Sequence, residues 1–232
     1  FWMWVTAIIG MATSFAECSL AQLYKEKDHH GQFRGGPAWY MARGLGMRWM
    51  GVLFSLFLLV AYGLIFNTVQ ANSVAHALRY AFACPEWLTG AGLALCILLT
   101  ISTGLKGTAR LMQWLVPIMA LLWVAASLLV AALHIDQVPD VIATIFSSAF
   151  GWREAASGAL GYTFSQALMA GFQRGMFSNE AGMGSTPNAA AAAASWPPHP
   201  AAQGIVQMIG VFTDTIIICS SSAMILLLAG PI

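Results

Sequence analysis

The chain has 232 residues, of which 59% are apolar and only 8% are charged, and its formal net charge is +1. Soluble domains carry about 25% charged residues, so this composition excludes an ordinary water-exposed globular protein. The small net charge also argues against a nucleic-acid partner. Uninterrupted apolar runs of about 20 residues recur, and they predict an all-α integral membrane protein embedded in lipid.

The apolar runs predict six spans within a single transmembrane domain covering residues 1–232. The spans lie at about residues 1–24, 49–78, 87–104, 108–134, 155–177 and 203–229. The first run starts without an initiator Met or a charged segment, so we expect an internal piece of a larger membrane protein and no signal peptide. Between the first two spans, Pro37 and Gly44 suit the start and end of a short interfacial helix. Pro117 is expected to kink the fourth span.

Several spans carry polar residues that need a partner inside the protein. Glu17 in the first span either reaches the interface, forms a structural pair or lies on an ion pathway. Asn67 and Gln70 share one helix face, which indicates either bonds between helices or a polar cavity. Gly158 and Gly161 in the fifth span allow a broken helix or close helix packing. Asp214 in the last span is a functional candidate, with a structural pair as the alternative.

Basic residues are distributed unequally between the two sides of the predicted membrane domain. The connectors after the first, third and fifth spans hold Lys25, Lys27, Arg34, Arg43, Arg48, Lys106, Arg110 and Arg174, whereas the opposite connectors hold Arg79 and Arg153. Because cytoplasmic loops are rich in Lys and Arg, residues 25–48 and 171–194 are predicted to be cytoplasmic. The polar half of the second span and the Gly-rich half of the fifth then both extend from the outside to the midplane.

Three classes of function fit a bundle of this kind to different degrees. A secondary transporter would have broken helices, polar groups at mid-membrane depth and a few intramembrane charges. A membrane enzyme requires a nucleophile, base or metal constellation, but the sequence holds no H-E-x-x-H, G-x-S-x-G or Cys/His cluster. We therefore expect no enzyme and no cofactor. An ion channel or a purely structural bundle is the third class, and an ion flux that depends on solute would separate a transporter from it.

Two motifs carry a resemblance to a known family. Residues 33–40 read F-R-G-G-P-A-W-Y and are followed by Gly44-Leu45-Gly46, while residues 174–185 read R-G-M-F-S-N-E-A-G-M-G-S. These stretches resemble the G-G-P-x-x-Y…G-L-G loop and the R-G-x-F-S-N-E-A-G-x-G-S signature of the sodium:alanine (alanine or glycine:cation) symporter family. Residues 1–17 and 69–73 resemble the starts of its second and third helices, so the similarity covers nearly the whole chain.

The resemblance implies the second to seventh helices of a five-plus-five inverted-repeat, leucine-transporter-like fold. It implies sodium-coupled symport of a small neutral amino acid, alanine or glycine, across the cell membrane of a bacterium or archaeon, with proton or other cation coupling as the alternative. The implied substrate contacts are Phe66, Gln70, Gly158, Gly161 and Thr163. Thr213 and Asp214 become candidates for binding sodium or for structural support.

The signature from Gly171 to Ala194 is predicted to lie beyond the substrate site, on the cytoplasmic side. We therefore interpret it as a gate or hinge, carried by Arg174, Ser178, Asn179 and Glu180. Ser178 or Asn179 can cap a short helix, while Arg174 and Glu180 can pair with each other or with the basic loop 25–48. Its Gly and Ala residues allow the close sliding that opening requires.

Overall fold

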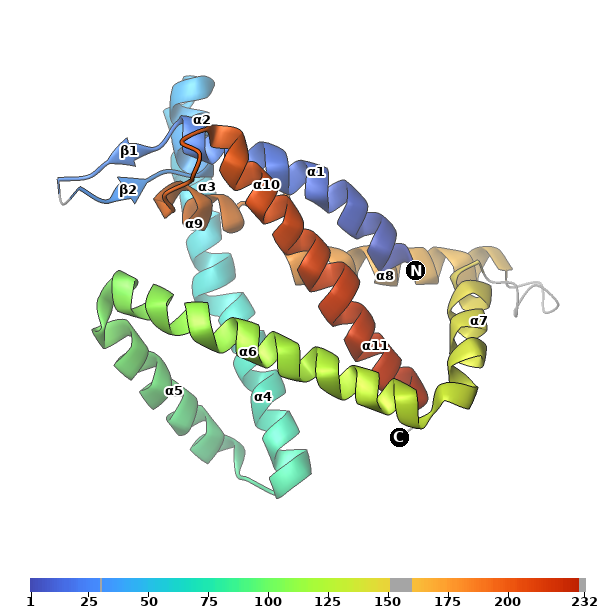
Figure 1. Ribbon diagram of the computed structural model, residues 1–232. Helices are drawn as coiled ribbons and strands as arrows, with labels where there is room; N and C mark the ends of the chain where they lie inside the picture. Colours follow the sequence, from blue (N-terminus) through green and yellow to red (C-terminus); the bar gives the residue numbers. More distant parts are fainter. Residues whose placement is uncertain (30, 151–159, 230–232) are drawn as a thin grey trace. The chain divides into compact units, whose positions relative to one another are not determined.

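The computed structural model describes residues 1–29, 31–150 and 160–229, and the side chains of residues 105–106 and 160–163 also lie outside the described part. The described chain is predominantly helical (Figure 1). It forms two compact units, one made of residues 1–52 and 122–232 and the other of residues 53–121.

The first unit is built around α1 (Trp2–Leu23), which packs against the other long helices of this unit. Its main partner is a continuous helix composed of α10 (Pro200–Val211), the π-helical η4 (Phe212–Ile218) and α11 (Cys219–Leu228) (Figure 1). The unit also contains α8 (Leu160–Asn179), α9 (Thr186–Ala192), α7 (Val138–Ala149) and the 3₁₀ turn η2 (Ile135–Gln137).

Small residues allow the helices of the first unit to approach closely. A Cβ atom built on Gly175 of α8 would lie 2.8 Å from the Cβ atom of Thr6 on α1. A Cβ on Gly204 of α10 would lie 2.9 Å from Phe15 of α1. Trp4 adds a polar link between the helices, because its indole N–H donates to Ser220 Oγ at 2.7 Å. Helix α1 therefore packs closely against both α8 and α10.

A short hairpin follows α1 and leads to the predicted interfacial helix. Strands β1 (Glu26–Lys27) and β2 (Phe33–Arg34) pair antiparallel, with Glu26 opposite Arg34. The helix α2 spans Pro37–Gly44, so the predicted short helix is confirmed, with Pro37 in its first turn. Gly36 has a φ of 119° and faces Asn188 of α9 so closely that no side chain fits. The loop formed by residues 35–37 therefore packs directly against α9.

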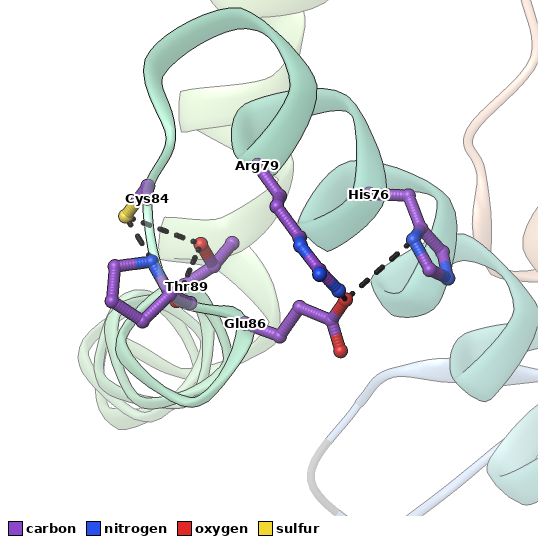
Figure 2. A network of polar contacts seen from close by, with 6 residues as sticks. His76, Arg79, Cys84, Glu86 and Thr89 are labelled. Atoms are coloured by element: carbon purple, nitrogen blue, oxygen red, sulfur yellow. Dashed lines mark hydrogen bonds and ion pairs between the residues drawn. The ribbon is translucent and has the colours of Figure 1, made fainter.

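The second unit contains the C-terminal part of α3 (Arg48–Val60), the π-helical η1 (Ala61–Phe66), α4 (Asn67–Phe82), α5 (Glu86–Ser102) and the start of α6 (Gly104–Leu133). At the turn between α4 and α5, Arg79 Nη1 donates to Glu86 Oε1 at 2.8 Å, and His76 Nδ1 lies 3.6 Å from the same oxygen (Figure 2). The Thr89 hydroxyl approaches Cys84 Sγ at 3.6 Å. These contacts tie the start of α5 back to the end of α4.

Four helices of the described chain are long and apolar enough to cross a membrane: Trp2–Leu23, Arg48–Phe82, Gly107–Leu133 and Pro200–Leu228. They coincide with the predicted first, second, fourth and sixth spans. The predicted third span corresponds to α5, which has 17 residues. The predicted fifth span corresponds to the 20-residue α8. The inverted-repeat arrangement of these spans stays a prediction.

Helix α7 was not predicted, because residues 136–140 were assigned to a connector between spans. Its first turn contains Pro139 and Asp140. Proline is favoured at the first helical positions, and an acidic side chain there interacts favourably with the helix dipole. Pro139 and Asp140 interrupt an apolar run, but they also favour the start of a helix. A search for apolar runs detects the interruption and not the helix start.

The close approach of α8 to α1 predicts opposite effects for two Gly→Ala substitutions. Gly175→Ala is expected to destabilise the protein by about 1–3 kcal/mol, because its Cβ would overlap the Thr6 side chain. Gly92→Ala in α5 is the control, since no described atom lies within 4 Å of its Cβ position, and Ala favours a helix by about 1 kcal/mol over Gly. Thermal unfolding of both variants checks this, and equal melting temperatures would contradict it.

Candidate functional site

The signature loop, residues 178–185, leaves the C-terminal end of α8 and lies against α1 and η4. Helix α8 ends at Asn179, and Glu180 then adopts a φ of 53°. Gly182 and Gly184 follow with φ values of 85° and 80°. The left-handed position after a helix normally holds Gly, and a side chain there costs roughly 1–2 kcal/mol. The chain thus carries a carboxylate at a position where backbone conformation favours Gly.

Ser178 connects the end of α8 to the π-helical segment of the α10–α11 helix. Its hydroxyl donates a hydrogen bond to Asp214 Oδ2 and lies 3.0 Å from Cys219 Sγ. Asp214 belongs to η4, and π-helical turns within α-helices are frequent at functional sites. Asp214 is therefore held by a hydroxyl partner from a second helix.

Asn179 forms the most buried polar link of the loop. Its Nδ2 donates to Thr215 Oγ1 at 3.3 Å, and its Oδ1 accepts the backbone N–H of Ala181 at 3.0 Å. Asn179 is 8% exposed and Thr215 is fully buried. The Asn179 side chain therefore hydrogen-bonds both a backbone N–H at the start of the loop and a hydroxyl group of η4.

Glu17 anchors the middle of the loop to α1. Its Oε2 accepts the backbone N–H of Gly182 at 3.1 Å. Gly10 makes room for this approach, because a Cβ there would lie 3.2 Å from Ala181 Cβ. Burial raises the pKa of Tyr40 on α2 to about 12, and the nearby Glu17 carboxylate adds to this rise. Helix α2 also contacts α1, the helix that carries Glu17.

Glu180 forms a hydrogen bond within the signature loop, because its Oε2 accepts from the Ser185 hydroxyl.

The polar residues joined by these bonds form what we call the signature cluster: Glu17, Ser178, Asn179, Glu180, Asp214 and Thr215. Its donors and acceptors come from α1, the signature loop and η4, so it joins three parts of the first unit. The acceptor atoms that its side chains offer are all oxygens, from carboxylate, hydroxyl and amide groups.

The proposed gate residues divide into two groups. Ser178, Asn179 and Glu180 all lie in the signature cluster, whereas Arg174 is exposed one turn earlier on α8. Neither Arg174 nor Glu180 belongs to an ion pair within the described part of the chain, where loop 25–48 instead pairs Arg34 with Asp28 and Arg43 with Glu26. The role of Arg174 at a gate stays a prediction.

The candidate sodium ligands also differ in their surroundings. Asp214 faces Ser178, but Thr213 is exposed and donates to Ile209 O of its own helix at 2.9 Å. The next threonine, Thr215, is the one that meets the signature loop. Sequence reasoning missed Thr215, although its place beside Asp214 in an apolar run was a usable signal.

The predicted substrate residues lie in separate parts of the chain. Phe66 ends η1 and stacks on Tyr62 with ring centroids 4.7 Å apart, while Gln70 is exposed one turn later in α4. Both belong to the second unit. Gly158 lies outside the described residues, as do the side-chain surroundings of Gly161 and Thr163 in the first turn of α8. The substrate site therefore stays a prediction.

The difference between Thr213 and Thr215 predicts the outcome of two matched substitutions. Thr215→Val leaves the buried Asn179 amide without its partner and is expected to destabilise the protein by about 1–3 kcal/mol. Thr213→Val removes an exposed hydroxyl that bonds only its own helix, and it is expected to change stability by less than about 0.5 kcal/mol. Thermal unfolding of the two purified variants measures this, and a larger loss for Thr213→Val would contradict the assignment.

Comparison with known proteins gives consistent matches along the whole chain. The model of the sodium:alanine symporter family matches residues 1–232. An uncharacterized transporter of Escherichia coli, YaaJ, is 71% identical over 99% of this chain and 48% of its own length. The probable sodium/glutamine symporter GlnT of Bacillus subtilis is 48% identical over 98% of this chain and 46% of its own length.

A third relative comes from an archaeon. The sodium/alanine symporter AgcS of Methanococcus maripaludis is 41% identical over 99% of the chain and 50% of its own length. The chain spans about half the length of the curated relatives it matches. With its apolar helices and the family's signature sequence in the cluster described above, the chain belongs to the sodium:alanine symporter family.

Proposed function

We propose that the complete protein containing this chain is a sodium-coupled symporter that carries a small neutral amino acid, alanine or glycine, into the cytoplasm. Membership of the family supports cation-coupled transport of an amino acid. The names of two relatives, a sodium/alanine symporter and a probable sodium/glutamine symporter, support sodium as the coupling ion. The long apolar helices support transport across a membrane.

The observation that carries this proposal is the position of Asp214 opposite the C-terminal end of α8. Helix C-termini attract cations, because the last carbonyl groups carry partial negative charge. Here that end meets a carboxylate and the hydroxyl of Ser178. In transporters with broken helices, sodium is coordinated by the C-terminal ends of half-helices and by backbone carbonyl groups of the unwound segments. We therefore propose that sodium binds at or beside Asp214, with Ser178 and Thr215 as further oxygen donors.

The substrate is proposed to bind elsewhere, at the residues implied by the family resemblance. Phe66 and Gln70 are four positions apart on one helix, so an aromatic ring and an amide lie on the same side of it. Gly158 precedes α8 in the sequence, and Gly161 and Thr163 belong to the first turn of α8. Backbone groups exposed by a break there would bind the amino and carboxylate groups of an amino acid.

The signature loop is proposed to act as the gate between the substrate site and the cytoplasm. Its left-handed residues, Glu180, Gly182 and Gly184, are positions that absorb changes in backbone angles. The hydrogen bonds of the signature cluster hold the loop against α1 and η4, and their release would free it. Sodium bound to the Asp214 carboxylate would weaken the hydrogen bond that Ser178 donates to it and so couple the ion to the gate.

The function is tested by uptake of labelled alanine and glycine by the complete protein in proteoliposomes. Sodium, lithium and proton gradients are imposed one at a time, with the other conditions held constant. We expect uptake that depends on an inward sodium gradient and is at least about tenfold lower in Asp214→Asn, since loss of a charged ligand costs about 1.5–3 kcal/mol. Uptake that is indifferent to all three gradients would contradict symport.

The gate proposal predicts a specific kinetic change in Glu180→Gln. Glu180 bonds Ser185 within the loop and does not lie among the proposed substrate contacts. The variant is expected to slow turnover several-fold, while the apparent affinity for the amino acid changes by less than about twofold, because the loop would gate movement rather than bind substrate.

Ser185→Ala is the matched variant, since it removes the other partner of the same hydrogen bond and leaves the charge of Glu180 in place. It is expected to slow turnover in the same direction. A large loss of affinity with unchanged turnover, in either variant, would be incompatible with a gate.

A further inference from the structure

The predicted cytoplasmic end of the first unit contains a cavity that the transport cycle proposed above does not use. Its volume is about 370 Å³. Its lining includes Gln22 and Lys25 from the end of α1, Phe33 from β2, and Ser195 and His199 from the segment between α9 and α10. Among the described residues, none that lines it is acidic.

Two ammonium groups converge on the aromatic wall of this cavity. Lys25 Nζ lies 4.1 Å from the centre of the Phe33 ring, and Lys27 Nζ lies 5.4 Å from it. Lys25 also donates to Gln22 Oε1 at 2.6 Å, so its position is fixed. The neighbouring carboxylates are already engaged, because Glu26 pairs with Arg43 and Asp28 with Arg34. Within the described part of the chain, Lys25 has no carboxylate partner.

His199 supplies a further donor to the cavity. Its Nδ1 accepts the backbone N–H of Ala201 at 3.2 Å and so caps the start of α10. In the neutral ring, an accepting Nδ1 assigns the proton to Nε2, which is then a donor. The cavity therefore combines a hydrogen-bonded cation, a second cation nearby and a neutral donor, and no carboxylate among the described residues lines it.

The segment beside the cavity also has the character of a membrane interface. Trp196, between Ser195 and the prolines that precede His199, is 91% exposed. Exposed Trp side chains are typical of the headgroup layer of a membrane. Basic pockets on the cytoplasmic side of membrane proteins bind the headgroups of anionic lipids.

We propose that this cavity binds a phosphate group, supplied by the headgroup of an anionic phospholipid of the cytoplasmic leaflet. Lys25 and the Nε2–H of His199 bind the phosphate oxygens, and Lys27 adds positive charge nearby. Burial lowers the pKa of Lys25 from its usual value, and a bound anion would offset that effect. A lipid held there would link the end of α1 to the start of α10.

The test measures binding to the complete, detergent-purified protein by the rise in melting temperature with ligand concentration. The probes are short-chain dihexanoyl phosphatidylglycerol, dihexanoyl phosphatidylcholine and inorganic phosphate, at constant ionic strength. We expect phosphatidylglycerol to bind more tightly than phosphatidylcholine. Lys25→Gln is expected to weaken phosphatidylglycerol binding about tenfold, because a charge-assisted hydrogen bond is lost.

Three further variants separate binding from folding. Lys25→Arg keeps the charge and is expected to retain most of the affinity. Arg48→Gln removes an exposed charge that does not line the cavity and should bind as the wild type does. His199→Asn keeps a capping acceptor but loses the Nε2–H donor, so it should weaken binding. If Lys25→Gln does not fold, His199→Asn still tests the site.

The probes also distinguish the source of the phosphate. Binding of phosphatidylglycerol with little effect of inorganic phosphate supports a lipid, whereas inorganic phosphate that binds equally well and depends on Lys25 supports a site for free phosphate and overturns the lipid assignment. Equal affinity of wild type and Lys25→Gln for phosphatidylglycerol, or no stabilisation by any probe, would overturn the site itself. Because the readout is stability, the outcome is independent of transport.

Discussion

The end of helix α8 imposes the constraint on which the rest of the first unit depends. The chain leaves the C-terminal end of this helix through a loop whose polar side chains and backbone N–H groups need partners once they are buried. Here the partners come from within the protein: Thr215 for the Asn179 amide, Asp214 for the Ser178 hydroxyl and Glu17 for the Gly182 amide. The loop therefore leaves the helix against polar groups that α1 and η4 present to it.

Close packing and polar bonding support each other in this arrangement. The loop reaches Glu17 because Gly10 leaves space for Ala181, and α8 reaches α1 because Gly175 leaves space for Thr6. Small residues at helix contacts are typical of membrane proteins, where packing rather than a hydrophobic driving force holds helices together. A contact made of short hydrogen-bonding side chains and glycines can also be released and reformed without large rearrangement of bulky groups. That property suits a gate better than an apolar interface would.

Much of this fold could be predicted from apolar runs, since a long helix in lipid needs little more than continuous hydrophobicity. The spans at Trp2–Leu23 and Pro200–Leu228 were recognised in this way, whereas the short helix at Pro37 was recognised from the Pro and Gly that suit its start and end. Helix α7 was missed because its Pro and Asp signals also mark a connector. The partners of the signature loop could not be predicted, because Thr215 and Glu17 are distant in sequence and only the folded chain brings them to Asn179 and Gly182.

The central claim, that the signature cluster is a contact which opens during transport, is tested most directly by hydrogen exchange of the complete protein. The backbone amides of residues 181–185 would be followed with sodium alone and with sodium plus a transported amino acid, and α5 would serve as the internal reference. The account predicts faster exchange of these amides during turnover, because the bond from Gly182 to Glu17 is then broken part of the time. Identical exchange under both conditions, in a preparation that is active in uptake, would contradict it.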